Sequence, residues 1–499
     1  MLNVVRESKT YHLVKKWFMV LYLSYKATFI YKLFMSDEKH DFSGSIFYKF
    51  FEFLKKGFLF INKCAINSYT YKFFQKTLVK TSLKEVMDGS AILDIFKITG
   101  DGYDMSFFAF LVLMFSASLI PTMAVVGLIF FVLFLLLLES KFKEKAALSK
   151  PIFTDVLIAL YLVALFYSFL ISKDPERMNV FLIYAAFIGF YYVVRYFIDT
   201  KKRVELAFSY FTVSGFFVCL YAFYQYVTGD YGAASWMDEK MFTAIEMRVY
   251  STFMNPNVLG EYLLFLIPIS LALTITTKKF MHKAIFGLIL ICSAVTLFLT
   301  YSRGCWIGLI IGMFIFVVLL YPKITVALIA LAPFSIFVLP RSIIQRFQSI
   351  GNLNDSSTTF RVNIWRGTMS MLEKLWPAGV GLGVNSFQRA YMPYAYSDVV
   401  TQHPHNSYLH ILCESGIFGL VVFLALFFWV IRQLFLAYKM SESKTLKILS
   451  VAQIAGLTGL FVQGFFDSTF YNYRMYLIFF IMIAVSVALS EVAKRSVKS

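Results

Sequence analysis

Charged residues are scarce in this chain of 499 residues, at 15% of the total, whereas 59% are hydrophobic and the mean hydropathy is +0.69. So little charge cannot cover the surface of a soluble protein, and a soluble enzyme or binding domain is therefore excluded. Repeated long apolar runs are instead typical of a polytopic membrane protein. Because an open sheet would leave backbone groups unpaired in hydrocarbon, we expect an all-α fold.

Cysteine is also rare, and none of the five residues pairs into a spaced motif: Cys64, Cys219, Cys292, Cys305 and Cys413. Four of them lie in or beside apolar runs, where cysteine usually behaves as a small hydrophobe. The sequence therefore predicts neither a disulfide framework nor a cysteine-based zinc site. A convincing internal repeat is missing as well, which counts against a transporter, because transporters often contain such repeats.

About twelve segments are long and apolar enough to cross a bilayer, which takes roughly 20 mostly apolar residues. Pro121 separates the first two, and a tight corner at 301–304 separates the seventh from the eighth. The predicted spans are 105–120, 122–138, 154–172, 178–197, 205–228, 257–276, 282–301, 304–321, 323–340, 407–431, 446–466 and 472–490.

Positive residues exceed negative ones by 18, a balance also found in nucleic-acid-binding proteins. Here the lysines and arginines gather in short loops between spans, as topology determinants do, and we predict no nucleic-acid partner. These loops all follow even-numbered spans, so we expect both termini in the cytoplasm. The segments 229–256, 341–406 and 467–471 and the corner at Arg303 should then face outward.

Residues 1–104 form a separate region, in which aromatic residues such as those at 47–53 are interleaved with lysines. This mixture favours helices that lie in the inner headgroup layer, held by apolar insertion and by anionic lipid. The alternative is a solvated basic tail. The transmembrane domain would then comprise residues 105–490, with 341–406 as its large outward loop.

Two arginines stand at the predicted outward face beside turn-forming residues. Arg248 precedes the sequence Asn255-Pro256-Asn257, which is typical of a turn that caps the following helix. It could contact lipid phosphate or hold a bound anion. Arg303 interrupts two apolar spans on the side that short loops rarely make positive, so we predict a phosphate-binding role for its planar guanidinium. The alternative for Arg303 is an ion pair with a carboxylate such as Asp467.

The outward loop should contain a helix from about residue 355 to Trp376. Arg361 and Trp365 are four residues apart and share one face of it, with Arg366 beside them. Such a basic and aromatic helix is expected on the outer membrane surface.

Three of the six histidines follow within eight residues: His403, His405 and His410. A metal site would need further ligands, and no Asp or Glu lies close in sequence except Asp398 and Glu414; we therefore predict none. A histidine near a helix end is often structural. With Asn406 next to it and arginines on the same face, His405 is better interpreted as a general base, since a neutral imidazole with a pKa of about 6.5 accepts a proton from a hydroxyl.

These motifs, and the order in which they follow one another along the chain, resemble those of bacterial O-antigen ligases and the related O-antigen and capsule polymerases. These proteins are membrane glycosyltransferases that use polyprenyl-linked donors. The resemblance covers residues from about 105 to 490. Its most specific element is His405-Asn406, followed after nine residues by Gly416 and then Gly419. Supporting elements are the segment from Arg248 to Asn257, the corner Ser302-Arg303-Gly304, and the pair Arg361 and Trp365.

The resemblance implies a GT-C-like fold in the bacterial cytoplasmic membrane, with the active site on the outer face. It implies a reaction without metal or cofactor that inverts the anomeric carbon. A glycan would pass from a pyrophosphate-linked polyprenol, typically undecaprenol, to an acceptor hydroxyl on a glycan or lipid-linked acceptor. His405 would deprotonate the acceptor, while Arg303 and Arg248 would stabilise the leaving pyrophosphate. Substrate-binding roles would fall to Arg361, Arg366, Asn406, Trp365 and Asn257.

The resemblance leaves the acceptor open. A ligase, a polymerase and a protein O-oligosaccharyltransferase all need a base, an anion clamp and a lipid groove. A transporter or flippase for lipid-linked glycans is the competing class, and it would explain the outward arginines as substrate contacts. A flippase should carry charged groups along the middle of its spans, however, whereas these spans are nearly free of charge in their interiors.

Overall fold

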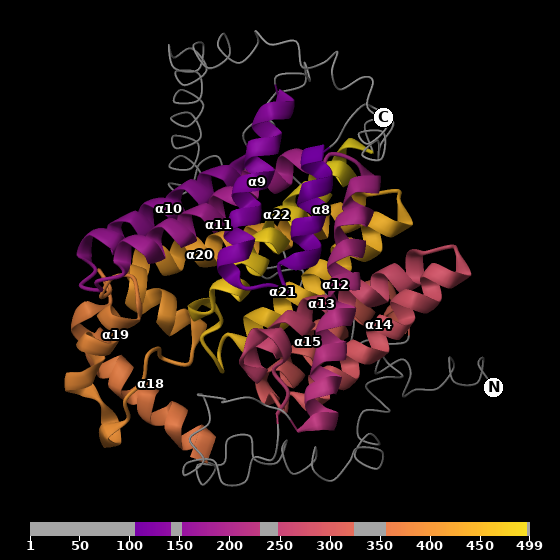
Figure 1. Ribbon diagram of the computed structural model, residues 1–499. Coiled ribbons are helices and arrows are strands. Elements are labelled where there is room, and N and C mark those ends of the chain that lie inside the picture. Colours follow the sequence, from indigo (N-terminus) through magenta and orange to yellow (C-terminus); the bar gives the residue numbers. More distant parts are fainter. Residues whose placement is uncertain (1–104, 141–151, 230–247, 324–355, 497–499) are drawn as a thin grey trace, which may run out of the picture. The chain divides into compact units, whose positions relative to one another are not determined.

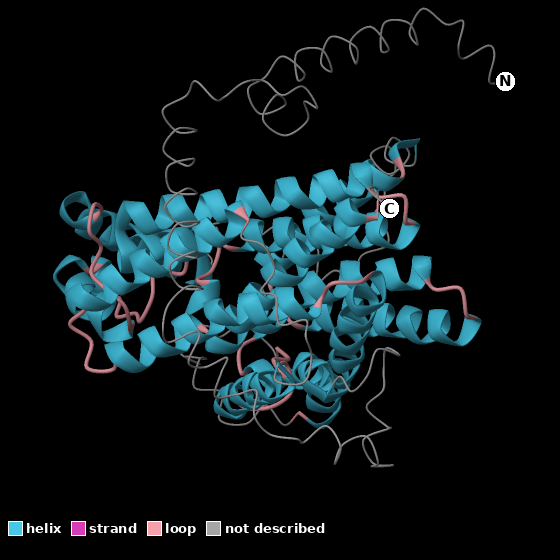
Figure 2. Cartoon of the chain, turned by 90° about the horizontal axis from the view of Figure 1, so that it is seen from above, coloured by secondary structure: helices cyan, strands magenta, loops and turns pink. Residues whose placement is uncertain are grey.

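The computed structural model describes residues 105–140, 152–229, 248–323 and 356–496, all of which belong to one compact unit. Every regular element among these residues is a helix, as Figure 2 shows, which confirms the all-α prediction for this part of the chain. The basic region 1–104 lies outside the described residues, as do most of the predicted span 323–340 and the first part of the outward loop.

Each predicted span that falls within the described residues coincides with a helix. Nine of the described helices are long and apolar enough to cross a membrane, while α8 and the stretch Thr122–Leu136 of α9 are shorter apolar helices. The helices of these spans are α8 (Met105–Ser116), α9 (Thr122–Ser140), α10 (Phe153–Ile171), α11 (Arg177–Phe197), α12 (Lys201–Thr228), α13 (Pro256–Thr276), α14 (Phe280–Leu299), α15 (Arg303–Leu320), α20 (Ser407–Met440), α21 (Lys444–Gln463) and α22 (Tyr473–Arg495).

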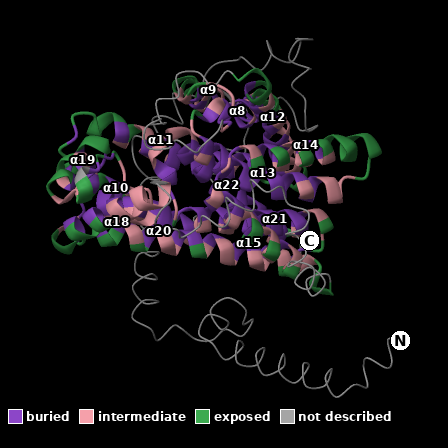
Figure 3. Ribbon diagram, turned by 90° about the horizontal axis from the view of Figure 1, so that it is seen from below, coloured by how far each residue is buried: buried purple, intermediate pink, exposed green. Residues whose placement is uncertain are grey.

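Helix α22 forms the core of the bundle. In the most apolar stretch of α22, 94% of the residues are buried, whereas the corresponding share for α14 is 28%. Helix α22 is therefore enclosed by protein, while most residues of α14 are at least partly exposed. Helices α11, α20 and α21 all pack against it (Figure 1), and the burial colours of Figure 3 place it among the most enclosed elements. A helix that is apolar on all sides is expected in such a position.

Helix α15 packs closely against α21 through glycines spaced four residues apart: Gly304, Gly308 and Gly312. A Cβ atom at Gly308 would lie 2.4 Å from the carbonyl oxygen of Gly459, and one at Gly312 would lie 2.4 Å from that of Ala455. Small residues at this spacing allow two membrane helices to approach backbone to backbone. The close packing fixes the start of α15 against the end of α21.

Helix α20 is broken at Gly416, which has a φ of 63° and a ψ of −173°. The segment after α18 (Ser356–Leu375) fits into this break: Val380 donates a backbone hydrogen bond to the carbonyl of Cys413, and Ile417 donates one to that of Trp376. A Cβ atom at Gly416 would lie 2.3 Å from the carbonyl oxygen of Pro377. Glycine is therefore required here both by the backbone angle and by the close approach.

The loop predicted to face outward folds into α18 and α19 (Val384–Tyr391), with the short 3-10 helices η4 (Met392–Tyr394) and η5 (Tyr396–Asp398). Helix α18 ends within a residue of the predicted end. A small core joins α18 and α19 to the first turns of α20, beside which they lie in Figure 1: Met371, Leu372, Phe387, Tyr391 and Cys413. This core holds the loop against the membrane helices.

Arg195 is a buried arginine of α11 that forms ion pairs with two neighbouring helices. Arg195 bonds to Asp155 of α10 at 2.8 Å and to Glu491 of α22 at 2.8 Å. Tyr191 also donates its hydroxyl to Asp155. A buried charge is tolerated when it is paired and hydrogen-bonded in this way, so Arg195 joins three helices rather than lining a transport path.

We expect Gly308→Ala to destabilise the protein, because the new methyl group would push α15 away from the backbone of α21. Overpacking of this kind costs about 1–3 kcal/mol. Thermal unfolding of the purified protein in detergent would measure the loss. Gly189→Ala is the matched control, since its Cβ would meet nothing within 4 Å. Equal melting temperatures for the two variants would show that close α15–α21 packing is not needed for stability.

Candidate active site

Three arginines from separate segments line one cavity of about 400 Å³: Arg248, Arg303 and Arg361. Asn257 and Trp365 line it as well, so five of the residues proposed from the sequence meet there. The described residues that line the cavity include no carboxylate. A cavity with this lining is suited to an anion, and its guanidinium groups are suited to phosphate oxygens.

The local backbone explains how two of these arginines reach the cavity. Arg303 is the first residue of α15, directly after a corner at which Tyr301 has a φ of 49°. Arg248 is held from two sides, because its Nε donates to the carbonyl of Thr300 at 2.7 Å and its terminal nitrogen donates to Oδ1 of Asn257 at 2.8 Å. Asn255 caps α13 by accepting from the backbone of Asn257, as the sequence predicted.

Helix α18 supplies the third arginine and the tryptophan. The Nε of Arg361 donates to the carbonyl of Phe466 at 2.9 Å, which ties α18 to the loop after α21. The indole N–H of Trp365 donates to the carbonyl of His405 at 3.4 Å. His405 therefore lies beside the cavity that Trp365 lines.

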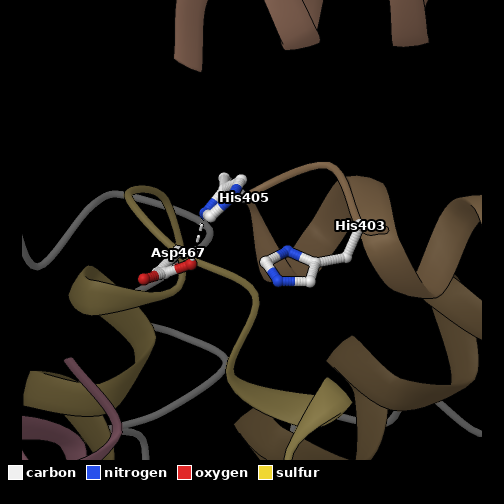
Figure 4. A group of neighbouring side chains, drawn as sticks. All are labelled: His403, His405 and Asp467. Atoms are coloured by element: carbon white, nitrogen blue, oxygen red, sulfur yellow. Dashed lines mark hydrogen bonds and ion pairs between the residues drawn. The ribbon is translucent and has the colours of Figure 1, made fainter. Parts of the chain in front are cut away.

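Asp467 connects this cavity to the histidine. Its Oδ1 lies 2.9 Å from Nδ1 of His405 and accepts a hydrogen bond from the Ser468 backbone (Figure 4). Its Oδ2 accepts from the amide of Asn257 at 2.5 Å and lies 4.0 Å from Arg361. The carboxylate proposed as a possible partner for Arg303 thus engages His405, Asn257 and Arg361.

The charge on Asp467 determines the proton position on His405. Burial favours the protonated acid, but the positive charge and hydrogen bond of His405, and then the charge of Arg361, outweigh burial and hold the pKa of Asp467 below its ordinary value. An ionised carboxylate can only accept hydrogen bonds. Nδ1 of His405 must therefore donate, so in the neutral form of the ring the lone pair lies on Nε2. This tautomer is the one a general base requires.

The backbone around His405 is unusual and firmly held. His405 has a φ of 47°, a left-handed conformation that is uncommon for a residue other than glycine and that clusters at active sites. The next residue, Asn406, donates its backbone N–H to the Ser468 hydroxyl at 3.1 Å. Ser407 donates its own to the carbonyl of Gly464 at 2.7 Å. These bonds fix the loop that carries His405 to the loop that carries Asp467.

His403 lies next to His405, with their ring centroids 4.2 Å apart, and stacks on Tyr471 of the 3-10 helix η6 (Thr469–Tyr471) at 4.3 Å. Burial of its ring, followed by the charge of His405, lowers the pKa of His403 well below the usual imidazole value. His403 is therefore neutral. His410 lies in the first turn of α20 and faces Glu414 at 3.4 Å, so the three histidines do not form one ligand set among themselves.

Three of the residues proposed from the sequence are not among those that line the cavity: His405, Arg366 and Asn406. Arg366 is exposed, and its guanidinium stacks over the ring of Tyr396 at 5.2 Å. The side chain of Asn406 caps α20 by accepting from the backbone of Tyr408 and Leu409. Neither the contact between Asp467 and His405 nor the place of Gln463 in the cavity lining is predicted from the sequence. The one signal for Asp467 was its position as a carboxylate in a short outward loop of a chain with little acid.

Comparison with known proteins finds similarity over part of the chain. Residues 287–424 match the family model described as O-antigen ligase, and this range includes Arg303, Arg361 and His405. A curated relative is the teichuronic acid biosynthesis protein TuaE of Bacillus subtilis (strain 168), which is 21% identical over 327 residues. That match covers 62% of this chain and 65% of the relative, slightly less than two thirds of the relative's length. The protein is thus a multi-pass membrane protein whose residues 287–424 are similar to the O-antigen ligase family.

Proposed function

We propose that this protein is a membrane glycosyltransferase of surface polysaccharide assembly, which moves a glycan from an undecaprenyl-pyrophosphate-linked donor to an acceptor hydroxyl. The observation that carries the proposal is the convergence of Arg248, Arg303 and Arg361 on one cavity beside the pair His405 and Asp467. The family match supports the reaction class. The name of the relative, which refers to teichuronic acid biosynthesis, supports a role in building a cell-envelope polysaccharide.

The proposed reaction is a single displacement at the anomeric carbon. Nε2 of His405 takes the proton of the acceptor hydroxyl as the acceptor oxygen forms its bond to the anomeric carbon. The bond from that carbon to the pyrophosphate oxygen breaks at the same time, and the electron pair leaves with the pyrophosphate. Attack opposite to the leaving group inverts the configuration. General base catalysis of this kind contributes roughly 10²–10⁴ in rate.

The arginines of the cavity would stabilise the leaving group. Negative charge grows on the pyrophosphate as its bond to the sugar breaks, and guanidinium groups already in place stabilise that charge without reorganisation. Arg248 and Arg303 are the proposed direct contacts, and Arg361 supports them while it also faces Asp467. Several fixed positive charges could replace the divalent cation that neutralises pyrophosphate in other enzymes, so we propose that the reaction needs no metal.

Substrate access follows from the membrane setting. The polyprenyl chain would lie in lipid among the apolar helices, with its pyrophosphate at the cavity and its glycan on the outer side of the cytoplasmic membrane, both termini being cytoplasmic. Trp365 and Asn257 would contact the donor. Arg366 and Asn406 are weaker candidates, since one is exposed over Tyr396 and the other caps α20. Arg366 would guide lipid phosphate.

The function is tested by incubating the purified protein in detergent with an undecaprenyl-pyrophosphate oligosaccharide and EDTA, followed by mass analysis of the products. A ladder of longer lipid-linked glycans would identify a metal-independent polymerase. Transfer that appears only with an added lipid or protein acceptor would identify a ligase or a protein glycosyltransferase. No transfer to any acceptor would contradict the proposal and favour transport of the lipid-linked glycan.

We expect His405→Ala to lower turnover by about 10²–10⁴-fold, because the acceptor hydroxyl would lose its base. Binding of the donor, measured separately with the labelled lipid-linked glycan, should persist, since the arginines remain. His282→Ala is the matched control, because His282 is exposed on α14. Full turnover in the His405 variant would exclude this histidine as the base.

Asp467→Asn should lower turnover as well, because an amide does not fix the His405 tautomer in the way an ionised carboxylate does. If Asp467 acts through His405, the double variant with His405→Ala should be no slower than His405→Ala alone, as happens when residues work as a unit. The turnover of the four proteins in this cycle is the measurement. A double variant slowed by the product of both effects would show that Asp467 acts independently.

Arg303→Lys should be impaired by about 10²-fold or more, the loss typical for one donor to a developing anion. An ammonium keeps the charge but lacks the planar fork that contacts two phosphate oxygens. Arg389→Lys serves as the control, because this exposed arginine of α19 bonds to the carbonyl of Lys173 through one terminal nitrogen. Equal rates for the two lysine variants would assign Arg303 a general electrostatic role instead.

A further inference from the structure

His403, His405 and Asp467 bring three metal-ligating side chains together. Their ligand atoms, one from each residue, all lie within 4.8 Å of one another (Figure 4). Two imidazole nitrogens and one carboxylate oxygen form the donor set of many three-ligand zinc sites. Calcium and magnesium prefer oxygen ligands alone, so the chemistry of the cluster favours an ion of the zinc class.

A second observation points to a ligand at this position. Nδ1 of His403 is buried and lacks a hydrogen-bond partner among the described residues. A buried polar atom without a partner is costly, and native proteins satisfy nearly all such atoms. The ring is also held in place, because it stacks on Tyr471, whose hydroxyl accepts from the side chain of Asn255. Its orientation is therefore built into the fold.

The three ligand atoms, which lie within 4.8 Å of one another, are more widely spaced than those around a bound ion. Bonds of about 2.0–2.1 Å to a tetrahedral zinc ion place the ligand atoms roughly 3.3 Å apart. The pair His405 and Asp467 is already at 2.9 Å, so binding an ion requires mainly that these two side chains and His403 draw closer together. Arg361 lies 4.0 Å from the other oxygen of Asp467, and its positive charge weakens the binding of a cation. Such a site would fill and empty with the free metal concentration.

We propose that His403, His405 and Asp467 form an inhibitory site for a zinc-class divalent ion. A neutral imidazole has one lone pair in the plane of its ring, so His405 cannot bind a metal and accept the proton of the acceptor hydroxyl at the same time. The ion also draws Asp467 away from its hydrogen bond to His405. The inhibitory effect rests on the function proposed above, whereas binding of the ion does not.

Binding is tested on the full-length protein in detergent after removal of metal with a chelator, by calorimetric titration with Zn²⁺. We expect one ion per chain at this site in the wild type. His403→Phe keeps a ring against Tyr471 but removes both nitrogens. It should weaken binding by more than the roughly 10–100-fold that even an outer-shell change costs. Asp467→Asn, which replaces the anionic ligand, should weaken binding as well.

His282→Phe is the matched control, because His282 is exposed on α14, away from the cluster. It should bind Zn²⁺ as the wild type does. Loss of affinity in the His403 and Asp467 variants alone would establish the site. Unchanged affinity in both of them, or no stoichiometric binding to the wild type, would overturn the proposal.

The inhibitory effect is measured as the ratio of glycan transfer with and without added Zn²⁺. This ratio should fall in the wild type and in His282→Phe, return to one with EDTA, and stay near one in His403→Phe. Binding at the cluster without transfer under any condition would leave the metal site standing and contradict the proposed function. Transfer that Zn²⁺ does not slow, in a protein that binds the ion at the cluster, would overturn the inhibitory role.

Discussion

The hydrogen bond between Asp467 and His405 is the interaction on which the site depends. Asp467 lies in the loop between α21 and α22, and His405 lies just before α20, so this bond joins two distant parts of the chain. The same carboxylate holds Asn257, which in turn holds Arg248. One buried anion therefore sets both the tautomer of the proposed base and the position of an arginine in the anion cavity.

Close helix packing is what allows these groups to meet. Glycine at 304, 308 and 312 lets α15 approach the backbone of α21, and this places Arg303 at the start of α15 near Gln463 at the end of α21. The break in α20 at Gly416 receives the segment after α18, and so sets the position of the helix that carries Arg361 and Trp365. The arginines thus come from segments whose positions are fixed by backbone contacts.

Apolar runs long enough to span a bilayer were sufficient to predict the helices, because the length and composition of a span are local properties. Arg248, Arg303, Arg361 and Trp365 could also be identified locally, since a cation beside turn-forming residues, or a cation and an aromatic residue four positions apart, can be recognised from a few neighbouring residues. Asp467 could not be linked to His405 in this way, because 62 residues separate them and two helices must pack before they meet. The glycine spacing of α15 is a local signal of close helix packing, because small residues four positions apart are visible in the sequence.

The placement of charge argues for catalysis at one face rather than transport through the bundle. The buried arginine of α11 is neutralised by carboxylates on two neighbouring helices, and so offers no free charge to a passing anion. The cavity arginines instead come from three separate segments, and the carboxylate that faces one of them, Asp467, has its Oδ1 committed to His405. A histidine held in one tautomer adds nothing to the movement of an anion across a membrane, whereas a hydroxyl that must lose its proton beside a leaving pyrophosphate requires it.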